Sequence, residues 1–357
     1  MAKSPEPLWT FLKPIGLTFV VGFIGAGLGT LMHLPVPALL GSGILVSILA
    51  FTRLPLAMPD GLRNAGFTVL GCSMGSGVTP EMLGLVGRWP ASLLLLVLTV
   101  VIMMASGVWL LSRFFGMDRH TALLACTPGG ASTVLAIATD DGADVRAVVV
   151  LQILRLLLVM AFLPLIIQTL GLQGGQGVNA SSAIMPWHHV LLLVLAAYAV
   201  ARLLAWFRVP AAFVLSGLLL SGFTHMEGWL DGRLPVPLVT LAFVIVGCMA
   251  GVRFVGVRLA EMKRYSVAAL ASVGLSTLIS ALLAGLAAWL LSLPFGQVWI
   301  AYSPGGIEAM AALAMALHFD PAYIAAHHLF RIVGLTLLLP LFSGWMKVRG
   351  RQPDRQT

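Results

Sequence analysis

Charged side chains are scarce in this chain. Only 10% of its 357 residues are charged, against roughly 25% in an ordinary soluble domain, while 59% are hydrophobic. A water-soluble fold could not cover so much apolar surface, so a soluble globular protein is excluded. Lys and Arg outnumber Asp and Glu by 21 to 13, yet they cluster in short loops and at helix ends. Their expected partners are anionic membrane lipids rather than nucleic acid.

Motifs that carry enzyme chemistry are missing as well. The chain has no Walker loop, dinucleotide fingerprint, HExxH, CxxC or nucleophile elbow. Its eight histidines are scattered, so we expect no metal, no cofactor and no catalytic residue. The three cysteines, Cys72, Cys126 and Cys248, lie in apolar segments. They are interpreted as small core residues rather than as a disulfide framework.

Long apolar runs are what the sequence has in abundance. A run of about 20 apolar residues can cross the ~30 Å hydrocarbon layer as a helix, and the lack of strict apolar-polar alternation favours helices over a barrel. The predicted fold class is therefore an all-α integral membrane protein. Ten transmembrane helices are expected, at residues 15–34, 36–51, 62–79, 89–111, 145–170, 185–207, 209–223, 236–252, 265–293 and 321–345.

The two halves of the chain resemble one another at a constant offset of 176 residues. At this offset Thr-Pro-Gly-Gly at 127–130 aligns with Ser-Pro-Gly-Gly at 303–306, and Arg155 aligns with Arg331. Asp144 and Asp320 also align, as do Pro164 and Pro340. Shared hydrophobicity would align leucines, but not proline, glycine, aspartate and arginine together. We infer a duplication, with one membrane repeat at 8–171, a second at 185–347, and a short basic tail at 348–357.

Each repeat contains one further segment, 120–139 or 297–318, that carries Pro-Gly-Gly near its middle. Because this motif interrupts a helix, the segment is either a broken span or a re-entrant hairpin. Orientation follows the Lys and Arg bias of short loops. With two hairpins, 17 basic residues fall inside and two, Arg88 and Arg233, fall outside; with two full crossings the numbers are 11 and 8. The count favours ten spans and two hairpins.

Five spans per repeat is an odd number, so the second repeat should be inverted relative to the first. Inverted repeats with interrupted helices that meet near the middle of the membrane are the architecture of many secondary transporters. The charge bias further predicts an inner-membrane location with both termini in the cytoplasm.

The hairpin tips are the first candidate binding site. Non-helical backbone inside a membrane is tolerated where it faces protein or a wet cavity, and helices that open after the glycines attract anions. A packing kink is the alternative. The residues concerned are Pro128, Gly129, Gly130, Ser132 and Thr133 in the first segment and Pro304, Gly305, Gly306 and Glu308 in the second.

Arg155 and Arg331 are candidates because each lies about ten residues into an apolar span, where a charge costs at least ~2.5 kcal/mol. Either they bind an anionic group of the cargo, or hairpin carbonyls or Glu308 neutralise them. Glu308 could instead carry a coupling proton.

Three further features stand out, and the last two have two readings each. Asp144 and Asp320 suit helix caps. For His327 and His328 the choice is between gating or proton transfer and interior hydrogen bonding. The glycine runs 71–77 and 247–251 are either packing faces or unwinding points.

The two Pro-Gly-Gly copies, each followed by an acidic residue and a span with an internal arginine, resemble the duplicated bacterial membrane family called AbrB. The stretch AHHLFR at 326–331 is the most specific part. Members of that family carry labels such as transcriptional regulator and ammonia monooxygenase. The first copy lacks the glutamate after Pro-Gly-Gly and the histidine pair, and has Gln152 where the second has His328.

The leading functional hypothesis is a secondary transporter or permease for a small anionic solute, with a proton or sodium as a possible coupling ion. The alternatives are a membrane protein that affects gene expression and a membrane monooxygenase. An oxygenase would need several His or carboxylate ligands converging at one depth.

The hairpin prediction can be tested by labelling. Single cysteines beside Arg113 and beside Asp144, in a variant without the three native cysteines, should react with a membrane-impermeant maleimide from the same side. A cysteine at Gly232 should react from the opposite side and serves as the control. Labelling of the first two positions from opposite sides would show that the segment crosses.

Overall fold

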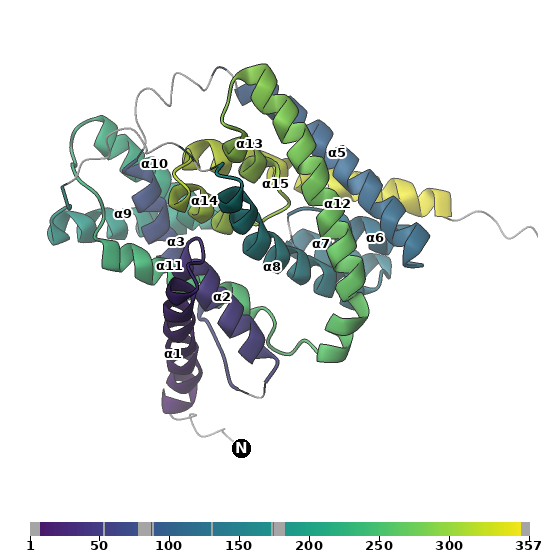
Figure 1. Ribbon diagram of the computed structural model, residues 1–357, viewed down its shortest axis with the longest axis horizontal. Coiled ribbons are helices and arrows are strands. Elements are labelled where there is room, and N and C mark those ends of the chain that lie inside the picture. The colour runs from purple at the N-terminus through teal and green to yellow at the C-terminus, as the bar shows by residue number, and fades with distance from the viewer. Residues whose placement is uncertain are drawn as a thin grey trace, which may run out of the picture. The chain divides into compact units, whose positions relative to one another are not determined.

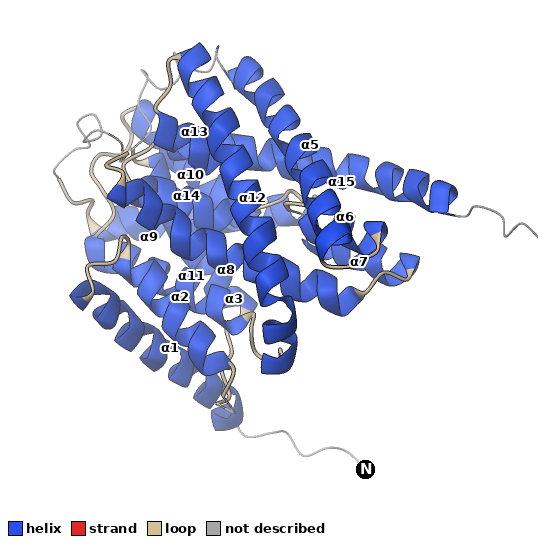
Figure 2. Cartoon of the chain, turned by 45° about the vertical axis from the view of Figure 1, so that its right-hand side comes forward, coloured by secondary structure: helices blue, strands red, loops and turns tan. Residues whose placement is uncertain are grey.

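The computed structural model describes residues 8–52, 54–77, 87, 89–129, 131–172, 174 and 183–350. This described part contains fourteen helices and no strand (Figures 1 and 2). The predicted all-α class is therefore confirmed. The basic residues Lys3, Arg53 and Arg88 lie outside the described residues, as do 351–357 of the predicted tail.

Six helices of the described part are long and apolar enough to cross a membrane. Each coincides with a predicted span that comes first, fourth or fifth in its repeat. They are α1 (Leu8–Leu31), α5 (Trp89–Phe114), α8 (Val145–Thr169), α9 (Trp187–Trp206), α12 (Leu259–Leu291) and α15 (Pro321–Gly350).

The other four predicted spans are also helical but shorter. They form α2 (Pro37–Ala50), α3 (Asp60–Gly75), α10 (Ala212–Met226) and α11 (Val236–Val252), of 14, 16, 15 and 17 residues. At 1.5 Å per residue these helices are about 21 to 26 Å long, less than the ~30 Å of a hydrocarbon layer. Six of the ten expected helices thus have a spanning length, and the crossing of the short ones stays a prediction.

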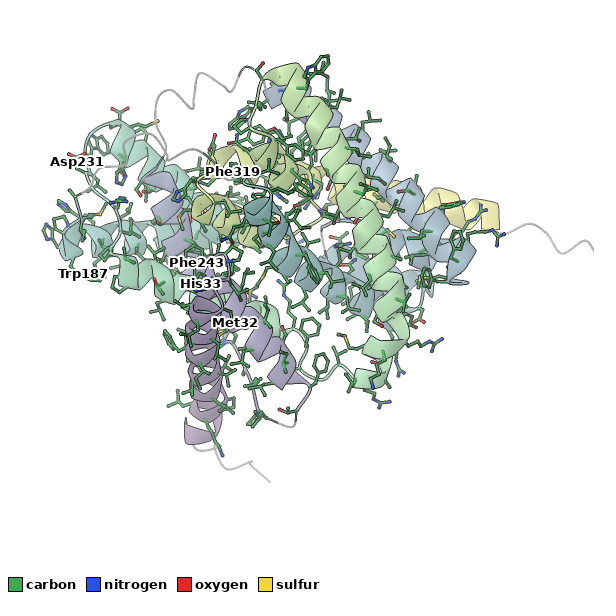
Figure 3. The ribbon with its side chains drawn as sticks, viewed as in Figure 1. Met32, His33, Trp187, Asp231, Phe243 and Phe319 are labelled. Atoms are coloured by element: carbon green, nitrogen blue, oxygen red, sulfur yellow. The ribbon has the colours of Figure 1, made fainter. Side chains whose placement is uncertain are left out.

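Apolar side chains on the long helices are widely exposed, which fits a lipid environment rather than water. Trp187 and Trp206, the first and last residues of α9, are 63% and 77% exposed, and Figure 3 labels Trp187 among the side chains. The 20 residues of α9 span about 30 Å. Tryptophans separated by this distance can sit at the two faces of a bilayer.

The chain forms two compact units. Unit 1 comprises Met1–Gly87, Met160–Leu259 and Ile307–Ala325, and unit 2 comprises Arg88–Val159, Ala260–Gly306 and Ala326–Thr357. Shifted by 176 residues, α1, α2 and α3 of unit 1 fall on α9, α10 and α11 of the same unit. In unit 2, α5 likewise falls on α12. Each unit therefore draws corresponding helices from both halves of the sequence.

Within unit 1, helix contacts come in corresponding pairs. Helix α3 packs against α10 and α11 against α2, while α1 packs on α2 and α9 on α10. At the offset of 176 residues, the contact between α3 and α10 corresponds to that between α11 and α2, and the contact between α1 and α2 corresponds to that between α9 and α10. Unit 1 also contains α14 (Ile307–Ala316), which contacts α3.

Glycines let these helices approach closely. A Cβ atom at Gly217 of α10 would lie 2.6 Å from both the carbonyl oxygen of Thr68 and the amide nitrogen of Cys72 in α3. In the corresponding contact, a Cβ at Gly247 of α11 would meet the backbone of α2. Both α3 and α11 are continuous through their glycine runs up to residues 75 and 252. The packing interpretation of the glycines is confirmed there.

Unit 2 contains α5 and α12, most of α8 and α15, and three short helices. The short ones are α6 (Arg119–Cys126), α7 (Ala131–Asp141) and α13 (Phe295–Tyr302). Helices α6 and α13 both contact α5.

Substituting Gly217 tests the packing of unit 1. Gly217→Ala should destabilise the protein by about 1–3 kcal/mol, because backbone atoms of α3 would have to move. Gly27→Ala in α1 is the matched control, since a Cβ there meets nothing within 4 Å; it should be neutral or stabilise by up to about 1 kcal/mol. Thermal unfolding of the purified variants measures both effects. Equal midpoints for the two variants would contradict the close approach.

Candidate functional site

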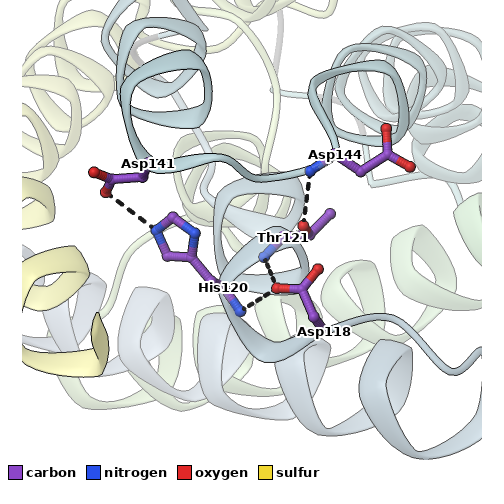
Figure 4. Close-up of polar contacts among 5 residues, drawn as sticks. All are labelled: Asp118, His120, Thr121, Asp141 and Asp144. Atoms are coloured by element: carbon purple, nitrogen blue, oxygen red, sulfur yellow. Dashed lines mark hydrogen bonds and ion pairs between the residues drawn. The ribbon is translucent and has the colours of Figure 1, made fainter. Parts of the chain in front are cut away.

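The first Pro-Gly-Gly segment folds back on itself within unit 2. Helix α6 leads into the motif and α7 leads away from it. Figure 4 shows that the start of α6 lies beside the end of α7: His120 Nε2 is 3.4 Å from Asp141 Oδ2, and the Asp144 amide donates to Thr121 Oγ1 at 3.1 Å. The chain therefore leaves the segment where it entered, as expected for a re-entrant hairpin.

Local sequence explains where α6 begins and ends. Asp118 caps the helix, and its Oδ1 accepts hydrogen bonds from the amides of His120 and Thr121 at 3.0 and 2.9 Å. Thr127, which precedes Pro128, has an extended conformation (φ −60°, ψ 117°), because proline disfavours helical geometry in the residue before it. Gly129 follows with φ +122°, a conformation that favours glycine.

The second motif breaks its helix at the equivalent residue. Helix α13 ends at Tyr302, and Ser303 before Pro304 is extended (φ −63°, ψ 148°). Helix α14 then begins at Ile307 and carries Glu308 in its first turn. The prediction that Pro-Gly-Gly interrupts both segments is confirmed.

Arg155 of α8 binds the carbonyl groups that the first break leaves without helical partners. Its Nη1 donates to the carbonyl oxygens of Ala125 and Thr127 at 3.3 and 2.9 Å, and the residue is only 6% exposed. These oxygens lie at the negative end of α6, where a positive charge is favourable. Neutralisation by hairpin carbonyls, one of the two readings for Arg155, is therefore observed.

Arg331 of α15 does the same at the second break. Its Nη1 donates to the Ser303 carbonyl oxygen at 2.5 Å and its Nη2 to that of Gly305 at 2.6 Å, with 3% of the residue exposed. Thr127 and Ser303 are equivalent at the offset of 176, so the two arginines make corresponding bonds. Gly129 also lies close to α15, since a Cβ there would be 3.1 Å from Ile332 Cγ1.

One helical turn before each arginine, a second side chain holds the same short helix. Gln152 Nε2 donates to the Leu124 carbonyl oxygen at 3.0 Å. His328, which is fully buried, places Nε2 at 3.0 Å from the Ile300 carbonyl oxygen. Its other ring nitrogen, Nδ1, lies 2.8 Å from Arg331 Nη2. Interior hydrogen bonding, one of the two readings for His328, is therefore observed.

The two arginines retain unused capacity for hydrogen bonds. The Nε atoms of Arg155 and Arg331 are buried and have no hydrogen-bond partner among the described residues. No described carboxylate of unit 2 forms an ion pair with either guanidinium. Their positive charges also act on one another. In the described part of unit 2, two like charges are thus buried with neutral groups as their hydrogen-bond partners.

The remaining predicted residues are placed as follows. Pro128, Pro304 and Gly305 are buried, Gly306, Thr133 and Glu308 are half-buried, and Gly130 and the side chain of Ser132 lie outside the described residues. Glu308 belongs to unit 1, where its charge acts on Arg253 at the end of α11. Asp144 and Asp320 are caps, as predicted: Asp144 Oδ1 accepts from the Ala147 amide at 3.0 Å, and Asp320 Oδ1 from the Ala322 amide at 2.8 Å.

Sequence reasoning singled out His327 but missed its partners beside the second break, Ser92 and Tyr302. Tyr302 donates to the Ser92 carbonyl oxygen at 2.6 Å, and His327 Nε2 lies 2.9 Å from Ser92 Oγ. The rings of Tyr302 and His327 stack with centroids 6.3 Å apart. In the first copy Cys126 stands at the position of Tyr302. That difference between the copies was the available signal.

Broken helices, buried arginines and apolar outer surfaces define a multi-pass helical protein of the membrane type. The chain belongs to the AbrB family: the family described as "Transition state regulatory protein AbrB" matches residues 39–347. It is 27% identical to "Putative regulator AbrB" of Escherichia coli (strain K12) over 342 residues, which cover 95% of this chain and 96% of the relative. It is 26% identical to "Uncharacterized protein YhjN" of Bacillus subtilis (strain 168) over 388 residues, with 99% and 98% covered. The predicted family is confirmed.

Asp118→Ala tests the base of the first hairpin. Loss of two cap hydrogen bonds should lower the free energy of unfolding by about 0.5–2 kcal/mol. Asp140→Ala, which removes an exposed carboxylate from α7, should change it much less. Thermal unfolding of the two variants provides the comparison, and an equal loss in both would argue against the cap.

Proposed function

We propose that this protein is a secondary transporter or permease for a small anionic solute, and that Arg155 and Arg331 form the anion site beside the two broken helices. The observation that carries the proposal is the pair of buried guanidinium groups, whose Nε atoms have no hydrogen-bond partner and which form no ion pair with a carboxylate among the described residues of unit 2. A buried charge is costly unless it is paired. An anion that reaches these groups would supply a compensating negative charge and accept hydrogen bonds from the two Nε–H groups.

The carbonyl contacts of the arginines arrange this site before a solute binds. Nη atoms of both residues are held by the ends of α6 and α13, so the guanidinium groups are kept in position when no solute is bound. A site arranged in advance binds with less loss of conformational freedom. The carbonyl oxygens themselves would repel an anion, which must therefore approach the guanidinium groups from the Nε side.

An inverted-repeat architecture would place this site in the membrane interior. Its support comes from the common offset of the two sequence halves, the corresponding helix pairs of unit 1, and the first hairpin, whose ends lie together. We further propose ten crossings and two hairpins, an inner-membrane location with cytoplasmic termini, and contact with anionic lipids. Discontinuous helices that bind solute at a repeat interface are common in secondary transporters.

The two alternative functions have less support. The Escherichia coli relative is named a regulator. The buried arginines have N–H donors for a small solute, but they do not identify a signalling partner. A membrane monooxygenase would need several metal-ligating side chains close together. In the described part of the chain no group of three or more His, Cys, Asp or Glu residues gathers in this way.

Binding and transport assays of arginine variants test the proposal. Purified protein is unfolded thermally with the sodium salts of sulfate, phosphate, succinate and citrate, and with sodium chloride at matched ionic strength. A bound anion at 100 times its Kd stabilises the native state by about 2.7 kcal/mol. At least one salt should stabilise the wild type, while Arg155→Ala and Arg331→Ala should lose this stabilisation.

Arg146→Ala is the matched control, because Arg146 lies on α8 as well but its side chain is 79% exposed; it should respond like the wild type. Uptake of the radiolabelled stabilising anion into proteoliposomes then separates a transporter from a sensor that only binds. Stabilisation of all four proteins to the same extent, or of none, would reject the anion site. Binding without uptake would favour the sensor.

A further inference from the structure

The hydrogen bonds of His328 identify its protonation state. The Ile300 carbonyl oxygen can only accept a hydrogen bond, so Nε2, 3.0 Å away, must carry a proton. Arg331 Nη2 can only donate, so Nδ1, 2.8 Å away, must offer a lone pair. Both bonds are satisfied by one form alone, the neutral imidazole protonated on Nε2. In this state His328 Nδ1 accepts a hydrogen bond from Arg331 Nη2, so that this N–H group is not available to a solute.

We propose that His328 takes up a proton together with the anion, so that the site couples solute binding to protons. The inference rests on the proposed anion site and names its coupling ion. A proton added to Nδ1 ends the hydrogen bond from Arg331 Nη2, because both atoms are then donors. Arg331 keeps its bonds to Ser303 and Gly305. The new Nδ1–H and the released Nη2–H both become available to an anion.

The charges around His328 make the two binding events depend on each other. Arg331 and His327 on α15 both act on His328, and Arg155 of α8 acts on Arg331. Two further titratable groups lie nearby: Tyr302 of α13, stacked on His327, and Cys126 of α6, between the two residues whose carbonyl oxygens Arg155 binds. No carboxylate among the described residues of unit 2 pairs with the arginines, so an added proton would be a further unpaired positive charge. A bound anion compensates this charge and so raises the affinity of His328 for a proton. By linkage, the proton raises the affinity for the anion by the same factor.

The first half of the sequence contains the natural comparison. Gln152 occupies the position equivalent to His328 and donates to the equivalent carbonyl oxygen, that of Leu124. An amide offers the same donor and an acceptor oxygen but does not titrate. His328→Gln therefore replaces the imidazole with the group that the protein itself uses at this position. Only the second half would then couple anion binding to protons.

Sulfate is a suitable probe because its charge does not change between about pH 5 and 8, the range in which histidine titrates. The apparent affinity for sulfate is obtained from thermal unfolding of the purified full-length protein at the two ends of this range, about pH 5 and about pH 8. For the wild type we expect binding about tenfold tighter at the lower pH, the gain of a charge-assisted hydrogen bond. His328→Gln should bind with the weaker affinity at both.

Two further variants give the test its specificity. His327→Gln, one residue away, and His188→Gln, at an exposed position of α9, should both keep the tenfold gain. Equal affinity of the wild type at the two pH values overturns the inference, whether or not the variant folds. The inference is also overturned if His328→Gln keeps the tenfold gain in affinity, whatever the result for His327→Gln. Absence of binding in every protein at both pH values, with sulfate and with the other three anions, counts against the anion site itself.

Proteoliposomes that contain a pH-sensitive dye give a second readout. An inward gradient of radiolabelled sulfate should acidify the interior with the wild type, whereas His328→Gln should take up sulfate without acidification. Uptake by the wild type without acidification rejects proton coupling and leaves the anion site intact. Failure of the wild type to take up sulfate, phosphate, succinate or citrate rejects the transport proposal instead.

Discussion

A helix cannot continue through Pro-Gly-Gly, and the carbonyl groups at its broken end need donors from elsewhere. In each half of this chain an arginine on the following long helix supplies them. Arg155 binds the end of α6 and Arg331 the end of α13. Gln152 and His328 bind one turn further back. Each short helix is thereby attached to a long one through polar groups buried in an apolar surrounding, where an unmade hydrogen bond is costly.

The same bonds explain why a structural role and a binding role are compatible. A guanidinium group has five N–H donors, and the hairpin carbonyls use only those of the Nη atoms. The Nε atoms remain buried and without partners among the described residues. Carbonyl dipoles partly offset a positive charge but do not cancel it. The residue that keeps the helix break in place therefore also retains the attraction for an anion.

The two halves share these bonds but differ in chemistry around them. The second half has His328, His327 and Tyr302 where the first has Gln152, Leu151 and Cys126. Histidine can change its charge at physiological pH, and glutamine cannot. The two halves thus share the hydrogen-bonding arrangement at the helix breaks, but only the second half places a histidine at this position. Unit 1, in contrast, uses glycine contacts that correspond closely between the halves.

Much of this protein was predictable from the sequence alone. Apolar run lengths located the six long helices, Pro-Gly-Gly located both breaks, and the rarity of charge within apolar runs singled out Arg155 and Arg331, because these are local effects of composition and backbone geometry. Only the tertiary structure decided that the hairpin ends meet, that the arginines bind carbonyls and leave Nε free, and that Ser92 and Tyr302 join His327. Ser92 lies 210 residues from Tyr302 and 235 from His327. Contacts over such separations depend on which helix faces pack together, and a uniformly apolar sequence does not mark those faces.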